Sequence, residues 1–119
     1  MVSAYIDGDA LKCVLALLMP DNALICRVSL ATGLRIGDVL RLRPEQLQKQ
    51  RFTVKEEKTG KSRRIHLPKD IWADMKKNAG DHWVFPGRDP RKHKTCQAVW
   101  ADVKRARKAL RMGANVSPH

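Results

Sequence analysis

The residues of this chain that could do chemistry are mostly basic. Lys and Arg number 24 against 12 Asp and Glu, for a formal net charge of +12, and there are four histidines. Chemistry at a phosphodiester needs fixed positive charge around the phosphate and a group that protonates the leaving oxygen. The planar guanidinium of arginine can hold two phosphate oxygens, and lysine or histidine can supply the proton. The composition therefore favours binding or chemistry at a polyanion.

An excess of positive charge this large attracts DNA, RNA or an anionic membrane surface, and the simplest alternative is a merely soluble basic protein. The longest apolar stretch, residues 13–19, is far too short to span a membrane. The three cysteines, Cys13, Cys26 and Cys96, are widely spaced and odd in number, which argues against a disulfide framework. We therefore expect a nucleic-acid partner, no membrane and a cytoplasmic location.

Candidate DNA contacts lie on two basic segments, a loop and the exposed face of the last helix. They are Arg91, Lys92, His93, Lys94, Lys104, Arg105 and Lys108. The helix face carries almost only positive charges, without the interleaved acidic residues typical of a solvated surface helix. This pattern favours phosphate contacts.

Hydrophobic residues recur at helical spacing in five segments. The predicted helices cover residues 7–19, about 22–32, 36–42, 68 to about 79, and 96 to about 111. Pro20 should end the first helix, and Asp21 or Asn22 should cap the second. Gly33 and Gly113 are the expected C-caps of the second and last helices.

Residues 51–56 and 63–67 alternate like half-buried strands, and the loop between them contains Gly60, as a hairpin connection requires. Residues 47–50 are predicted to add a short third strand. The expected fold is α+β and mainly α-helical, with the helices around a small three-stranded antiparallel sheet.

Four segments resemble motifs of the phage integrase (tyrosine recombinase) family, in the family's order. They are residues 31–42 (ATGLRIGDVLRL), 57–68 (EKTGKSRRIHLP), 84–87 (VFPG) and 116–119 (VSPH). They resemble, respectively, the first motif box, the β-hairpin, the Phe-Pro stretch before the next long helix, and the start of the second box. The resemblance covers nearly the whole chain.

The resemblance implies roles for particular residues. Arg35 would be a catalytic arginine on the scissile phosphate, and Lys58 would be the hairpin lysine that protonates the leaving hydroxyl, with Lys61 as the alternative. His119 would be the histidine that opens the second box. The family more often has Glu where Asp38 stands, which is a small departure.

Lys61 and Arg63 of the hairpin are further expected DNA contacts. The family's second catalytic arginine, third box and nucleophilic tyrosine would come after His119, and its core-binding domain would come before this chain. The single tyrosine, Tyr5, precedes the first helix and is expected to be a packing or surface residue.

We therefore expect residues 1–119 to be the N-terminal portion of an integrase catalytic domain, without the core-binding domain and the C-terminal catalytic segment. Such a fragment should bind double-stranded DNA but be inactive alone, because a chain without the nucleophile cannot form the phosphotyrosine intermediate. Strand cleavage and rejoining conserves the phosphodiester energy, so no metal or nucleotide cofactor is expected.

Two other functions fit the sequence. Residues 25–42 could form a helix-turn-helix, with residues 36–42 as the recognition helix of a DNA-binding regulator. The chain could also be a non-catalytic interaction module that forms a homo-oligomer through exposed apolar surface.

Two pairs of residues are expected to be structural. Trp72 and Trp100 lie at core spacing, and Cys13 and Cys26 should pack as small hydrophobic residues. The histidines show no metal-ligand spacing with the cysteines.

Overall fold

The computed structural model describes the backbone of residues 8–116 and the side chains of residues 12–110. Helices dominate, and one pair of strands lies in the middle of the chain. The elements are α1 (Gly8–Leu17), α2 (Pro20–Thr32), α3 (Ile36–Leu40), the 3-10 helix η2 (Pro44–Gln48), β1 (Arg51–Lys55), β2 (Ser62–His66), α4 (Lys69–Asn78) and α5 (Cys96–Val116). The predicted mixed and mainly helical fold is confirmed.

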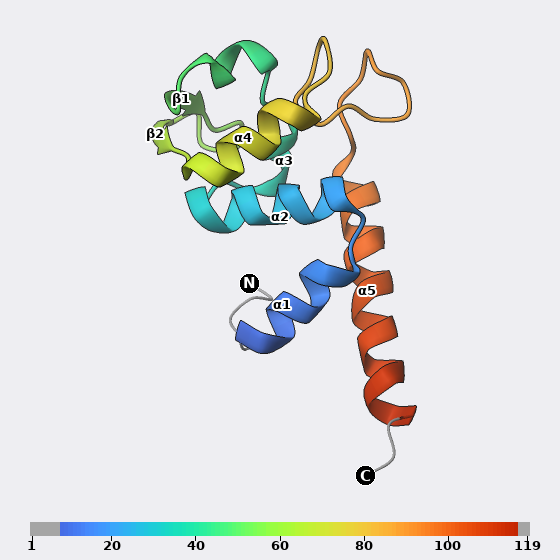
Figure 1. Cartoon of the computed structure of the whole chain (residues 1–119). Helices are drawn as coiled ribbons and strands as arrows, with labels where there is room; N and C mark the ends of the chain where they lie inside the picture. The colour runs from blue at the N-terminus through green and yellow to red at the C-terminus, as the bar shows by residue number, and fades with distance from the viewer. Residues whose placement is uncertain (1–7, 117–119) are drawn as a thin grey trace.

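The described elements form a compact body with a projecting arm. Figure 1 shows α2, α3, α4 and the hairpin grouped together, while α1 and the far end of α5 extend away from them. The principal extents of 50 × 29 × 27 Å reflect this elongation. Every element that carries the first two family motifs lies in the compact body.

The core of the body is built from apolar side chains of α2, α3, α4, the hairpin and the segment after α4. Ile25 and Val28 of α2, Leu40 of α3, Met75 of α4, and Phe85 are each at most 1% exposed. Burial of such side chains contributes roughly 1.5–3 kcal/mol each to folding. This core fixes the end of α2 relative to the hairpin.

The predicted capping of α2 by Asp21 or Asn22 is wrong. Met19 is the N-cap and Pro20 is the first residue of the helix. Proline suits this position because its φ is already helical and its missing N–H would have no helical acceptor there. The side chains of Asp21 and Asn22 instead bind residues of the chain's last third.

The hairpin pairs β1 and β2 in antiparallel register, with Phe52 opposite Ile65 and Val54 opposite Arg63. Val54 and Ile65 are buried on the inner face, and the alternate positions are exposed. The predicted alternation is therefore confirmed.

The third strand predicted over residues 47–50 is not found. Within residues 8–116, the sheet has two strands, and residues 44–48 form η2 instead. Pro44 begins this turn with a preset φ, and the Gln46 side chain accepts a hydrogen bond from the Arg43 N–H at 2.7 Å. Local turn chemistry thus outcompetes strand pairing here.

The arm is held by a small second cluster of apolar residues. Val14 of α1 and Leu18, the residue after α1, pack with Ala106 of α5, and Val103 and Leu110 of α5 flank this contact. With so few buried residues, this contact alone gives the arm little stability.

A buried carboxylate strengthens the joint between the arm and the body. Asp102 of α5 is 9% exposed and accepts hydrogen bonds from the Met19 N–H at 2.9 Å and the Asn22 amide at 2.7 Å. Arg105 donates to the same carboxylate and also to the Leu17 carbonyl at 2.7 Å. Asp102 therefore ties α5 to the junction of α1 and α2.

Three further expectations need correction. Trp100 is 50% exposed and Cys13 is exposed, so neither is a core residue. Trp72, in contrast, is partly buried and its indole N–H donates to the Leu47 carbonyl at 2.8 Å, as expected of a packing residue.

The predicted C-cap role of Gly113 is wrong, because the helix α5 continues past Gly113 to Val116. Of the helices described here, none is both long and apolar enough to cross a membrane.

The Asp102 joint makes a testable prediction about pH. Burial would raise the Asp102 pKa, but hydrogen bonds from Asn22, Met19 and Arg105, with the positive charge of Arg105, lower it below its ordinary value. The ionised carboxylate therefore stabilises the fold above about pH 4, and this contribution is lost as the pH falls through the folded-state pKa.

We expect Asp102→Asn to lower the free energy of unfolding by about 1–2 kcal/mol at pH 7, measured by urea denaturation, and the deficit to shrink at pH 3. The control is Asp81→Asn, which changes an exposed carboxyl. A deficit that does not change with pH would contradict the assignment.

Candidate functional site

Arg35 follows the end of α2, where hydrogen bonds fix the backbone conformation of residues 32–34. Gly33 adopts a φ of +76°, which favours glycine, and its N–H donates to the Ser29 carbonyl at 2.8 Å, so its predicted C-cap role is confirmed. The Thr32 hydroxyl accepts from the Leu34 N–H at 3.1 Å, and Leu34 is buried. The Arg35 side chain is exposed at the start of α3.

Arg63 binds the same segment from the hairpin. Its guanidinium donates to the Gly33 carbonyl at 3.0 Å and to the Thr32 carbonyl at 3.1 Å. A Cβ at Gly33 would lie 3.1 Å from this guanidinium, so the close approach also favours glycine. Arg63 thus joins the hairpin to the end of α2, and its expected DNA contact stays a prediction.

Lys58 lies in the loop between β1 and β2. The Glu56 N–H donates to the Lys61 carbonyl at 2.8 Å, and the Gly60 N–H donates to the Glu56 carbonyl at 2.8 Å. Gly60 adopts a φ of +69°, which closes the loop. Lys58 and Lys61 are both exposed, so their ammonium groups are available to a polyanion.

A buried carboxylate fixes this loop beside Arg35. Asp38 of α3 is 5% exposed and accepts a hydrogen bond from the Glu57 N–H at 3.2 Å. Arg41 donates to Asp38 and also forms an ion pair with the Glu57 carboxylate. Because Glu57 is adjacent to Lys58, these contacts determine where the lysine lies.

Arg35 and Lys58 line one cleft of about 410 Å³, together with Gly37, Asp38, Arg41 and Glu57. The cleft holds three cationic side chains and two carboxylates. An arginine and a lysine at one opening can bind phosphate oxygens, and the lysine can also donate a proton to a leaving oxygen. The cleft brings together two of the three residues predicted to be catalytic.

The third residue, His119, lies outside the described residues. In the part of the chain that the structure covers, no three His, Cys, Asp or Glu side chains gather closely enough to hold a metal ion.

The predicted basic loop forms a tight turn. The Gly87 N–H donates to the Lys92 carbonyl at 2.8 Å, and Pro86 and His93 form an isolated bridge. A Cβ at Gly87 would lie 3.1 Å from the His93 carbonyl oxygen. The loop therefore has a defined backbone, and it walls a cavity of about 670 Å³ that also reaches α2 and α5.

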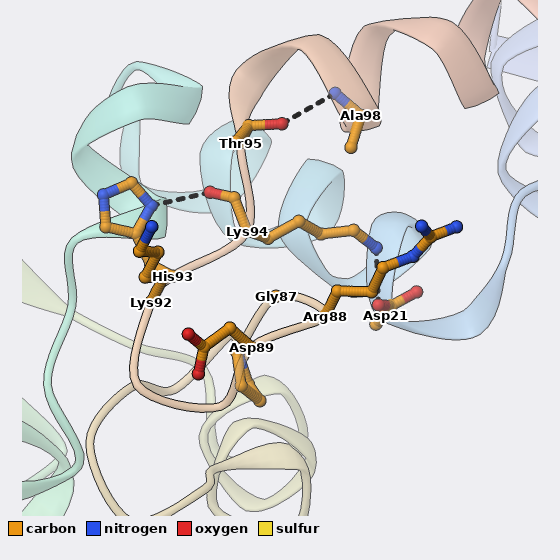
Figure 2. Close-up of a pocket in the computed structure, with 10 residues that line it drawn as sticks. Asp21, Gly87, Arg88, Asp89, Lys92, His93, Lys94, Thr95 and Ala98 are labelled. Carbon is orange, nitrogen blue, oxygen red and sulfur yellow. Dashed lines mark hydrogen bonds and ion pairs between the residues drawn. The ribbon is translucent and has the colours of Figure 1, made fainter.

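The four basic residues of this loop differ in their surroundings. Figure 2 shows the Lys94 side chain directed to Asp21, which it reaches at 2.5 Å, and this side chain is only 16% exposed. The His93 ring contacts the Lys94 carbonyl and packs edge-on against Trp83. Arg91 and Lys92 are exposed, and Arg91 pairs with a neighbouring carboxylate. Lys94 therefore has a structural partner, whereas Lys92 points to solvent.

The basic residues predicted on the face of α5 likewise differ, because some are exposed and one is bound within the fold. Lys104 and Lys108 are exposed, whereas Arg105 is bound to Asp102 and to the Leu17 carbonyl. Arg105 thus helps to attach the arm to the body. Its DNA contact, like that of the two lysines, stays a prediction.

Sequence reasoning missed Arg41 and Glu57 as parts of the cleft. Asp38 of α3 and Arg41, the C-cap of that helix, are three residues apart, a spacing at which opposite charges pair in helices, so the sequence indicates this contact. The ion pair between Arg41 and Glu57 depends on how the hairpin packs and had no such signal.

The geometry defines a class of site: a cleft with three cationic side chains between the start of a helix and a hairpin loop. The chain matches the sequence model of the phage integrase family over residues 9–119. It therefore belongs to the phage integrase family, and the resemblance seen in its motifs is confirmed.

The chain is also similar to the Integrase of Escherichia phage P2. It is 31% identical to this chain over 102 residues, which are 85% of this chain and 30% of that protein. The chain thus spans about a third of the length of this relative.

Asp38→Asn tests the positioning of the hairpin loop. The substitution removes the charge that binds Arg41 and weakens the hydrogen bond from the Glu57 N–H, so we expect hydrogen exchange at this amide to rise by about tenfold. The measurement is amide exchange by NMR. Glu45→Gln, at an exposed position of η2, should leave the exchange unchanged. Equal protection in the Asp38 variant and the parent chain would disprove this role.

Proposed function

We propose that this chain is the N-terminal portion of the catalytic domain of a site-specific tyrosine recombinase and that it binds the phosphate backbone of duplex DNA. The observation that carries the proposal is the shared cleft, which Arg35 and Lys58 line although they are 23 positions apart in the sequence. The family membership and the net charge of +12 support it.

In this proposal, the Arg35 guanidinium binds oxygens of the scissile phosphate and stabilises the charge that develops during attack on phosphorus. Lys58 donates a proton to the departing deoxyribose hydroxyl, which makes it a better leaving group. Both side chains are exposed at the cleft, so a DNA strand can reach them without prior unfolding.

Recombination also needs a nucleophilic tyrosine and a second arginine, by the family resemblance. Neither role falls on these 119 residues: the single tyrosine, Tyr5, precedes the first motif, and the second arginine would, by the resemblance, follow His119. We therefore propose that the chain as given binds DNA, in the cytoplasm of a bacterial or phage-infected cell, and does not cleave it.

A regulator of the helix-turn-helix type is less well supported. The helix that would read bases, α3, has five residues, and Asp38, Val39 and Leu40 of these are buried. A recognition helix must present several polar side chains to base edges, and α3 has none to offer.

DNA binding gives the central test. We expect the chain to bind duplex DNA with little sequence preference and the logarithm of the affinity to fall linearly with the logarithm of salt concentration. Arg35→Ala and Lys58→Ala should each weaken binding roughly tenfold and reduce the salt slope by about one, as loss of one phosphate contact does. Fluorescence anisotropy with a labelled duplex measures both quantities.

The matched control is Lys77→Ala, which removes an exposed positive charge of α4 that does not line the cleft. Its affinity should stay close to that of the parent chain. The proposal fails if the Arg35 and Lys58 variants, folded as judged by circular dichroism, bind DNA as well as the parent chain does.

Self-association is a second candidate property, favoured by exposed apolar side chains. Leu17 is 40% exposed, Met19 58% and Trp100 50%. Leu17 and Met19 lie at the junction of α1 and α2, where α5 contacts the backbone of both residues. We propose that a second copy of the chain covers this part of the arm.

Sedimentation velocity tests self-association. The parent chain should form dimers as its concentration rises, and Met19→Gln should weaken the dimer by about tenfold, because it removes apolar area from the interface. Leu30→Gln, at an exposed position on α2, should have little effect. A parent chain that stays monomeric throughout the concentration range would eliminate this property.

A further inference from the structure

A second cavity opens next to the cleft of Arg35 and Lys58. It has a volume of about 280 Å³ and is lined by Asp38, Arg41, Leu42, Arg43, Gln46, Val54, Lys55 and Trp83. Asp38 and Arg41 also line the first cleft. The two hollows therefore lie on either side of one shared wall, which the ion pair of Asp38 and Arg41 forms.

Arg43 is held rigidly at this second cavity. Its guanidinium carbon lies 3.6 Å from the centre of the Trp83 ring, and one nitrogen donates to the His82 carbonyl at 3.1 Å. Trp83 is fixed in turn, because its indole N–H donates to the Arg91 carbonyl at 3.0 Å. A stacked guanidinium loses little side-chain freedom when it binds a ligand, and its planar donor groups suit a phosphate.

Two further side chains at the cavity can donate hydrogen bonds, and the one carboxylate there, Asp38, is already bound by Arg41 and the Glu57 N–H. Gln46 uses its amide oxygen to accept from the Arg43 N–H at 2.7 Å, which leaves its amide nitrogen as the donor that can face a ligand. Lys55 is exposed at the end of β1 and carries an ammonium group. Arginine, lysine and amide donors around one hollow select an oxyanion.

We propose that Arg43, Gln46 and Lys55 form a second phosphate subsite, which binds a phosphate of the same DNA strand next to the one held by Arg35 and Lys58. The inference rests on the proposed function and extends it. DNA carries closely spaced phosphates along each strand. A strand seated in the first cleft must therefore pass over a neighbouring surface, and the shared wall makes this cavity such a surface.

The subsite gives the chain a defined direction of DNA approach. Two phosphate contacts on either side of Arg41 fix the strand in orientation as well as in position, since contacts to the backbone set the register of a protein on DNA. A single cleft would leave the strand free to pivot.

The salt dependence of DNA binding tests the subsite. Arg43→Gln should weaken binding to a duplex by roughly fivefold and reduce the salt slope by about 0.9, the value for one lost phosphate contact. Arg43→Lys keeps the charge but loses the planar stacked group, so its slope should be retained while its affinity falls. Lys69→Gln removes one exposed positive charge away from both cavities and should change neither quantity appreciably.

Lys55→Gln provides an independent variant if Arg43→Gln does not fold. Its salt slope should fall by about the same amount as that of Arg43→Gln. If both folded variants keep the slope of the parent chain while Arg35→Ala reduces it, the second subsite is disproved and the proposed function stands. If Arg35→Ala also leaves binding unchanged, the proposed function itself fails.

The indole N–H signal of Trp83, followed by NMR, distinguishes a DNA phosphate from a free anion. A short duplex should shift this signal in the parent chain and not in Arg43→Gln. Inorganic phosphate added alone should shift the signal only weakly. When the duplex is then added, the signal should move to the position that it has with the duplex alone. A saturating response to inorganic phosphate that the duplex does not displace would assign the cavity to a small anion and overturn the proposal.

Discussion

The candidate site depends on the buried carboxylate of Asp38. A carboxylate with 5% exposure is unfavourable unless charged or polar groups bind it, and here the Glu57 N–H and the Arg41 guanidinium do so. These two partners lie on different elements, so satisfying the buried charge also joins α3 to the hairpin loop. The need to pair one carboxylate thereby places Lys58 at the cleft that Arg35 lines.

The end of α2 provides the second constraint. A helix leaves its last carbonyl groups without helical partners, and Arg63 binds two of them, at Thr32 and Gly33. The hairpin is thus attached twice, by Arg63 from β2 and by the Glu57 amide from the loop. Two separate attachments resist rotation as well as translation of the hairpin, which the proposed phosphate site, with Arg35 and Lys58 in catalytic roles, would require.

Local features of the fold were predictable from the sequence, and contacts between distant segments were not. Gly33 and Gly60 occupy positive-φ positions that their neighbours in the sequence indicate. Strand alternation also places Arg63 on the inner face, beside Val54. Lys94, by contrast, pairs with a carboxylate 73 positions earlier, and Trp100 lies at core spacing on a helix whose face at that point is uncovered. Such outcomes depend on packing, which periodicity does not specify.

The same distinction separates the roles of the many basic residues. Arg63, Lys94 and Arg105 bind backbone carbonyls or carboxylates of other elements, so part of the net charge of +12 stabilises the fold. The cations of the first cleft would repel one another if unpaired. Asp38 and Glu57 offset that repulsion and allow the chain to hold the cations together before DNA arrives. A site arranged in advance loses less free energy to reorganisation when its ligand binds. In the proposed function, the two carboxylates would therefore favour phosphate binding by holding the cations in place, although neither would touch the phosphate.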